Sequence, residues 1–133
     1  MDYLTKAKEM FSNDIFASET TGIEILAAEP GYARCRLKIE KKHLNALNSV
    51  MGGAIFTMAD YAFAIAANIG GDIVVTINSQ ISYLGSAKGK ELYAEAKPIK
   101  SGRSTCVYNI DIRDELDTQV ACVSVTGFVK SKK

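Results

Sequence analysis

Alternation of apolar and polar residues marks six segments of the sequence as β-strands. The clearest is ARCRLKIE, residues 33–40, in which every second residue is apolar and those between are charged. This period of two predicts a strand with one face packed and the other in water. An EPGY turn joins it to residues 21–29, so the two segments are expected to form a hairpin. Further strands are expected at residues 72–84, 91–100, 104–113 and 118–130.

Two other segments have the pattern of helices. Residues 2–16 mix apolar and charged side chains at helical spacing, which predicts a surface helix that packs on the rest of the fold. Residues 54–69 are nearly all apolar and rich in alanine. This second run is too short for a membrane span and holds polar residues, so a buried core helix is the better interpretation. A helix that is apolar on most sides must be wrapped, which predicts an α+β fold: a curved antiparallel sheet around a long central helix.

Length, charge and cysteine usage narrow the class of protein. A chain of 133 residues with no linker or repeat is expected to form one domain, residues 1–133. The net charge of +1, with both signs mixed, argues against a nucleic-acid partner. The first residues contain no apolar signal-peptide core, and no segment predicts a membrane partner. Three cysteines without a CxxC pair are expected to be reduced and to pack in strands, which favours a cytoplasmic protein over one with a reactive thiol.

One carboxylate stands out in the central helix. Between His43 and Gly71 the only formally charged side chain is that of Asp60. An ionised carboxylate is costly to bury unless it is paired or hydrogen-bonded. Three interpretations follow: an exposed helix position, a structural ion pair at a subunit interface, or a catalytic general base or nucleophile in an apolar site.

The glycine pair at the start of this helix favours the catalytic interpretation. Gly52 and Gly53 would leave backbone N–H groups bare at a helix N-terminus, which is the outline of an oxyanion hole, although they could instead form only a sharp turn. Gly53 and Asp60 are seven residues apart and lie on nearly the same face, separated by about 10 Å along the axis. Two such helices running antiparallel across a dimer would bring Asp60 of one close to Gly53 of the other.

The sequence HLNALNSVMGGAIFTMADYAFAIAAN resembles the signature of hotdog-fold acyl-CoA thioesterases, in the phenylacetyl-CoA thioesterase-like branch. His43, Asn45, the Gly52-Gly53 pair and Asp60 match that signature. The segment INSQISYLGSAKGKELYAEAKPIKSGRSTCVYNIDI is similar to the family's next two strands and its Gly-Arg turn. The order of elements agrees over nearly the whole chain.

The resemblance implies roles for particular residues. Asp60 would activate water or attack directly, and the Gly53 N–H would polarise the thioester carbonyl. Asn45, from the subunit opposite to Asp60, would hold the thioester or the water. Thr76 falls near a position where the family often has a hydroxyl in the site. The family uses no metal and no bound cofactor; coenzyme A enters as part of the substrate.

Two departures from the family pattern bear on activity. Met51 replaces the usual histidine before Gly-Gly and cannot hydrogen-bond as an imidazole does, so lower activity or a different acyl preference is expected. Asn48 replaces the usual glycine earlier in the loop. The single histidine, His43, is expected to be solvated rather than catalytic.

For the coenzyme A part of the substrate, the resemblance points to the turns after the third and fourth predicted strands. Cations at glycine-containing turns are suited to phosphates, although the alternative is that they are merely solvated. The expected contacts are Tyr83, Lys88, Lys100, Gly102, Arg103 and Ser104.

These observations predict a homo-oligomeric acyl-CoA thioesterase, a dimer or a dimer of dimers. The main alternative is a non-catalytic acyl-CoA-binding hotdog protein, motivated by Met51. An acyl-CoA-sensing regulator would need a DNA-binding segment that the sequence lacks, and a hotdog dehydratase would need a histidine on the helix. The sequence contains no GxSxG, GxGxxG, P-loop or HExxH motif, and one histidine cannot make the usual metal cluster.

Overall fold

The computed structural model describes all residues from 1 to 133. Its helices are α1 (Tyr3–Phe11) and α2 (Gly52–Asn68), with a π-helical turn at Phe16–Thr21 and a 3-10 turn at Lys41–His43. Its strands are β1 (Glu24–Glu29), β2 (Tyr32–Lys38), β3 (Ile73–Tyr83), β4 (Glu91–Ser101), β5 (Thr105–Asp114) and β6 (Gln119–Ser131). The sequence pattern placed all six strands and the central helix to within a few residues.

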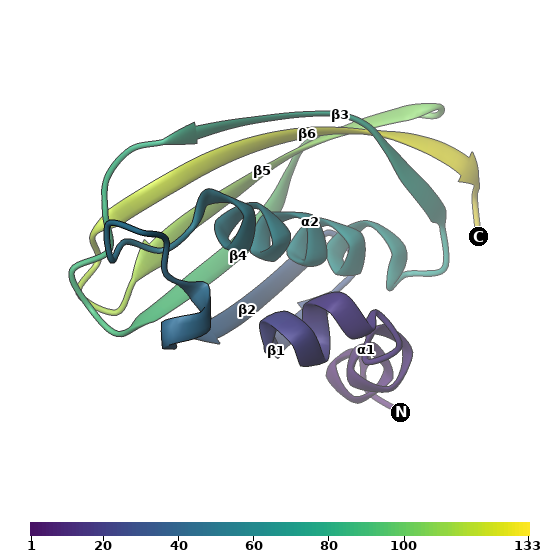
Figure 1. The fold of residues 1–133 in the computed structure, drawn as a ribbon. Coiled ribbons are helices and arrows are strands. Elements are labelled where there is room, and N and C mark those ends of the chain that lie inside the picture. The colour runs from purple at the N-terminus through teal and green to yellow at the C-terminus, as the bar shows by residue number, and fades with distance from the viewer.

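All strands belong to one antiparallel sheet in the order β1-β2-β4-β5-β6-β3. The sheet curves around α2, which lies in its concave side (Figure 1). This is the hotdog fold that the sequence predicted. Strands β1 and β3 form the two edges, so β3 has a hydrogen-bonded neighbour on one side only.

The period of two along each strand separates a packed face from a wet one. In β5 the buried side chains alternate with partly exposed ones, and the buried set faces the helix. Phe63 of α2 meets Tyr108 of β5 edge to face, with ring centroids 5.2 Å apart. A Cβ on Gly127 of β6 would lie 2.9 Å from the Phe63 ring, so the glycine makes room for this contact. The alternation therefore centres the helix on the sheet.

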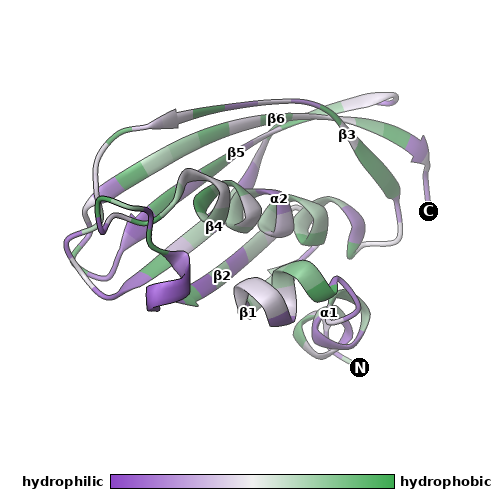
Figure 2. Ribbon diagram, viewed as in Figure 1, coloured by the Kyte–Doolittle hydropathy of each residue, from purple (hydrophilic) through white to green (hydrophobic).

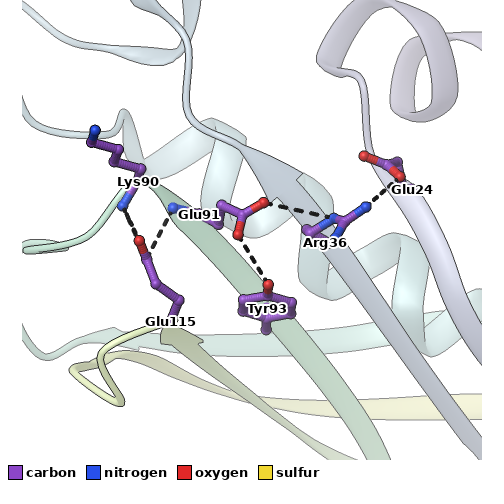
Figure 3. Close-up of polar contacts among 6 residues, drawn as sticks. All are labelled: Glu24, Arg36, Lys90, Glu91, Tyr93 and Glu115. Carbon is purple, nitrogen blue, oxygen red and sulfur yellow. Dashed lines mark hydrogen bonds and ion pairs between the residues drawn. The ribbon is translucent and has the colours of Figure 1, made fainter.

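The wet face of the sheet carries charged pairs rather than apolar contacts. Arg36 of β2 donates to Glu24 of β1 at 2.8 Å, and its Nε lies 3.8 Å from a carboxylate oxygen of Glu91 on β4 (Figure 3). Tyr93 donates to the same Glu91 at 3.1 Å. Colouring by hydropathy shows this contrast as hydrophilic and hydrophobic residues alternating along the strands (Figure 2).

Helix α1 is shorter than its pattern predicted, because side chains end it. It stops at Phe11, where the Ser12 hydroxyl donates to the Glu9 carbonyl at 3.0 Å and the Asn13 amide donates to the Met10 carbonyl at 3.1 Å. Such side-chain bonds compete with the helical backbone ladder. The chain then turns, and the residues up to Thr21 form a separate segment that packs near α2.

Helix α2 was expected to be wrapped by the sheet, but in the single chain one side of it is left uncovered. The sheet covers most of it, and α1 meets it where the Tyr61 hydroxyl donates to the Phe11 carbonyl at 2.7 Å. A stripe of small and polar residues on α2 remains uncovered in the single chain. It comprises Gly53, Thr57, Asp60, Ala64 and Ala67.

The prediction that His43 is solvated is wrong. Its side chain is only 4% exposed, and Nε2 donates to the Thr21 carbonyl at 2.7 Å while Nδ1 accepts from the Glu40 N–H at 2.9 Å. The ring thus ties the loop before α2 to the segment after α1. Both ring nitrogens of His43 are used in these hydrogen bonds, so the side chain stabilises the fold.

Two further features concern the cysteines and the lengths of the helices. The three cysteines are free and lie on strands β2, β5 and β6, as predicted. Neither α-helix is both long and apolar enough to cross a bilayer.

Candidate active site

The N-terminus of α2 presents two backbone N–H groups without acceptors. Met51, the N-cap, has an extended backbone and makes no side-chain cap, and neither Gly52 nor Gly53 donates its N–H to any protein group. A Cβ on Gly53 would meet nothing within 4 Å. Gly53 is exposed, and its N–H has no acceptor at the positive end of a 17-residue helix, which suits a developing negative charge.

The loop before α2 is held by Asn45. Its Oδ1 accepts from the N–H groups of Leu47 at 2.9 Å and Ser49 at 3.1 Å, which leaves the Nδ2 amino group as a free donor. Asn48 in the same loop has a φ of 62°, in the left-handed region that glycine and asparagine tolerate. Asparagine in place of the family's usual glycine is thus compatible with the same loop conformation.

Asp60 lies two turns further along α2, and its carboxylate has no hydrogen-bond or ion-pair partner within the chain. It borders a hollow of about 300 Å³ between α2 and the segment after α1. Asp60 itself is exposed in the single chain, yet the side chains around the hollow keep enough water away to raise the pKa of its carboxyl. The nearby Asp14 carboxylate raises this pKa further. The other residues around the hollow are Ile15, Phe16, Ala17, Thr57, Tyr61 and Ala64.

Within one chain these two parts of the site do not meet. Gly53 and Asp60 are separated by about 10 Å along the helix axis, and neither Gly53 nor Asn45 borders the hollow that holds Asp60. One chain thus carries an oxyanion-type donor at one point of α2 and a carboxylate of raised pKa at another. The uncovered stripe of α2 joins the two points.

Tyr83 and the residues after it lie beside the N-terminus of α2. The Tyr83 hydroxyl donates to the Gly52 carbonyl at 3.0 Å. Together with the loop before the helix, this segment encloses a second hollow of about 440 Å³ next to the bare N–H groups. Its remaining walls are Ser49, Val50, Ile55, Leu84, Gly85, Ser86, Ala87 and Val120.

The residues expected to contact coenzyme A fall into two groups at opposite ends of β4. Lys88 precedes this strand, whereas Lys100 lies at its far end and Arg103 follows in the next turn, and eleven extended residues span about 35 Å. One chain therefore does not bring the two groups together. Gly102 and Ser104 lie in the second turn, where the Gly102 N–H donates to the Thr105 carbonyl at 2.8 Å. Thr76 is exposed on edge strand β3, beside an irregularity in the ladder, and does not border the hollow at Asp60.

The hydrogen bonds that hold the loop with Lys88 could not be foreseen from the residue pattern. Asp114, which is 4% exposed, accepts from the N–H groups of Lys88 at 2.8 Å and Gly89 at 2.9 Å with one oxygen. Its other oxygen accepts from Leu116 and Thr118 in its own turn. Burial raises the pKa of the Asp114 carboxyl, but these backbone hydrogen bonds lower it by more, so it lies well below the ordinary value.

Glu115 holds the next residues of the same loop. Its carboxylate accepts from the Lys90 N–H at 2.8 and 2.9 Å and from the Glu91 N–H at 3.1 Å (Figure 3). It occupies the space that a side chain at Gly89 would need. From sequence alone these two acids belong to the DELD turn, and nothing in their spacing indicates the loop about 25 residues earlier.

Comparison with known proteins places this arrangement in a family. Residues 47–121 match the model of the thioesterase superfamily. A putative esterase of Archaeoglobus fulgidus is 34% identical over 128 residues, covering 96% of this chain and 79% of that protein. The acyl-coenzyme A thioesterase PaaI of Escherichia coli is 34% identical over 116 residues, covering 86% and 82%.

Solved structures agree with this placement over nearly the entire length. The structure of E. coli PaaI, from the phenylacetic acid degradation operon, superposes with a TM-score of 0.88, covering 99% of both chains at 28% identity. A hypothetical thioesterase of Streptococcus pneumoniae with coenzyme A has a TM-score of 0.84 at 25% identity, covering 92% of this chain and 98% of that one. The chain belongs to the thioesterase superfamily. Within it, the protein is a thioester hydrolase of the hotdog fold and the PaaI-like branch.

Proposed function

We propose that this protein hydrolyses acyl-CoA thioesters, with Asp60 as the reacting carboxylate and the Gly53 N–H as the carbonyl-polarising donor. The observation that carries the proposal is the pairing of two unsatisfied groups on one helix. Gly53 offers a bare N–H in open space, and Asp60 offers a partnerless carboxylate of raised pKa. The coenzyme A named with the S. pneumoniae relative supports the class of substrate.

Each group has a defined part in the proposed reaction. The Asp60 carboxylate takes a proton from water as the water oxygen attacks the thioester carbon; alternatively, Asp60 attacks that carbon itself and water then hydrolyses the anhydride. The carbonyl oxygen gains negative charge, which the Gly53 N–H and the helix dipole stabilise. The tetrahedral intermediate then collapses and expels the coenzyme A thiolate, which takes up a proton. The free Nδ2 of Asn45 is suited to hold the carbonyl or the water.

The separation of Gly53 from Asp60 supports a site shared by two chains. The uncovered stripe of α2 combines small and polar residues, and its Gly53, Ala64 and Ala67 leave room for a second chain to approach closely. Edge strand β3 has free backbone groups and exposed apolar side chains at Ile73, Val75 and Ile77, so it is suited to pair with a second copy. We therefore propose an antiparallel dimer, or a dimer of dimers, in which Asp60 of one chain faces Gly53 of the other.

The test is hydrolysis of a panel of acyl-CoA esters, followed by detection of the released thiol. Asp60→Asn should lower kcat/KM by at least about a hundredfold, because loss of a base or nucleophile costs several kcal/mol of barrier. Asp72→Asn, outside both hollows, is the matched control. Binding of acyl-CoA without turnover by the natural protein would instead favour the non-catalytic binding protein that Met51 suggests.

A further inference from the structure

We propose that the hollow beside Asp60 receives the acyl group and that Asp14 selects neutral acyl groups over those ending in a carboxylate. This inference rests on the proposed thioesterase function and names the substrate class of the same site. Asp14 belongs to the segment between α1 and the π-helical turn, outside the motif that defines the family resemblance.

The hollow has the size and lining for a compact acyl group. Its volume of about 300 Å³ is at the lower end of the range for small-molecule sites, too small for a complete acyl-CoA. Five of its eight lining residues are hydrophobic. Two of them, Ile15 and Phe16, are 52% and 66% exposed in the single chain. Large apolar side chains so exposed at the rim of a hollow gain from contact with an apolar ligand.

The position of the hollow relative to the reacting carboxylate fits the same ligand. Thr57, Asp60 and Ala64 follow one another at helical spacing along the wall that α2 contributes. The Thr57 hydroxyl is already used, because it donates to the Gly53 carbonyl at 2.8 Å. An acyl group whose carbonyl carbon reacts at Asp60 would therefore extend over apolar surface toward Ile15 and Phe16.

The charges around the hollow are all of one sign. Asp14 and Asp60 are its only ionisable groups besides Tyr61, whose hydroxyl is used in its bond to the Phe11 carbonyl. No lysine, arginine or histidine borders it. The Asp14 side chain makes no hydrogen bond or ion pair, so its charge is not used by the fold. A substrate carboxylate entering the hollow would meet two like charges without a counterion, which is a repulsive element of specificity.

The charge test compares butyryl-CoA and succinyl-CoA, which have acyl groups of equal chain length. The natural protein should prefer butyryl-CoA in kcat/KM, and Asp14→Asn should reduce this preference by about tenfold. Glu19→Gln, in the π-helical turn that follows Asp14 but outside the hollow, should leave the ratio unchanged. Since both esters react at the same Asp60, the ratio cancels any effect of Asp14 on its pKa. An unchanged ratio in an active Asp14→Asn protein overturns the role of Asp14.

A second pair of variants tests the position of the acyl group. Ala64→Leu narrows the hollow and should reduce kcat/KM for octanoyl-CoA relative to acetyl-CoA by about tenfold. Ala67→Leu, on the same stripe of α2 but outside the hollow, should change this ratio much less. Equal effects of the two variants would overturn the assignment of the hollow. Absence of hydrolysis of every ester by the natural protein would instead remove the proposed function on which the inference rests.

Discussion

Tyr83 lies across the first turn of α2, where its hydroxyl donates to the Gly52 carbonyl at 3.0 Å and fills the space that a Cβ on Gly52 would need. A methyl group there would come within 2.9 Å of the hydroxyl oxygen. Gly53, one residue on, has no such neighbour. The two adjacent glycines therefore serve different ends: Gly52 serves internal packing, and the open space at Gly53 suits an incoming group.

This difference predicts opposite effects on stability and activity. Gly53→Ala should stabilise the folded chain by about 0.5 kcal/mol, because alanine loses less entropy in a helix, while lowering kcat/KM by at least about tenfold by filling the space at the N–H. Gly52→Ala should instead cost about 1 kcal/mol by displacing the Tyr83 hydroxyl. Thermal melts and thioester assays of both variants check this. Full activity in Gly53→Ala would show that the reaction does not need the open space beside Gly53.

A shared site predicts complementation between inactive subunits. Asn45→Ala and Asp60→Asn homodimers should each be nearly inactive, whereas a mixed dimer holds one site with both residues intact and one with neither. Mixing should therefore restore part of the activity, which is measured after subunit exchange has been verified with differently tagged chains. Exchange without any recovery would count against a site shared by Asn45 and Asp60 of different chains.

The raised pKa of Asp60 predicts the acidic limb of the pH profile. Burial and then the Asp14 carboxylate favour the protonated form, so the reactive carboxylate is lost as the pH falls through a value above the ordinary 3.8. A plot of log kcat/KM against pH for a neutral acyl-CoA should bend in that range. Asp14→Asn should move the bend to lower pH, because it removes a like charge. A bend that stays in place in this variant would show that Asp14 does not act on Asp60.

The Asp114 carboxylate predicts a stability difference that depends on pH. Its pKa is lowered in the folded chain, so its stabilising effect is complete above the ordinary 3.8 and is lost as the pH falls below that value. Asp114→Asn should therefore lower Tm at pH 7 and have a much smaller effect near pH 2. Asp117→Asn is a suitable control in the same turn, because its φ of 65° is one that asparagine tolerates. Equal Tm values for the Asp114 variant and the natural protein at pH 7 would contradict this role.

Repeating residue patterns could be read from the sequence, whereas individual side-chain contacts could not. The strands followed from the alternation of apolar and polar residues, and α2 followed from its nearly continuous apolar run. The end of α1 at Phe11 was missed, because side-chain bonds from Ser12 and Asn13 override the apolar spacing. The burial of His43 was missed as well, because its partner Thr21 belongs to a distant segment.

The same distinction between residue patterns and individual contacts holds for the candidate site. Gly53 and Asp60 stand out in the sequence as a bare helix start and as a lone charge in an apolar run. Asp14 does not stand out, because it is one exposed acid among several and becomes relevant only where the chain folds back against α2. Asp114 and Glu115 resemble ordinary turn residues until the loop from Lys88 to Glu91 is brought beside them.

The strand order has a consequence for synthesis of the chain. Within the chain β3 pairs only with β6, so residues 73–83 have no partner until residues 119–131 leave the ribosome. The loop at Lys88 likewise waits for Asp114. A nascent chain can form the β1–β2 hairpin early. Strand β3, however, stays unpaired while β4, β5 and β6 are translated. The strand order therefore predicts that closing the long loop between β3 and β6 is the slow step in completing the sheet.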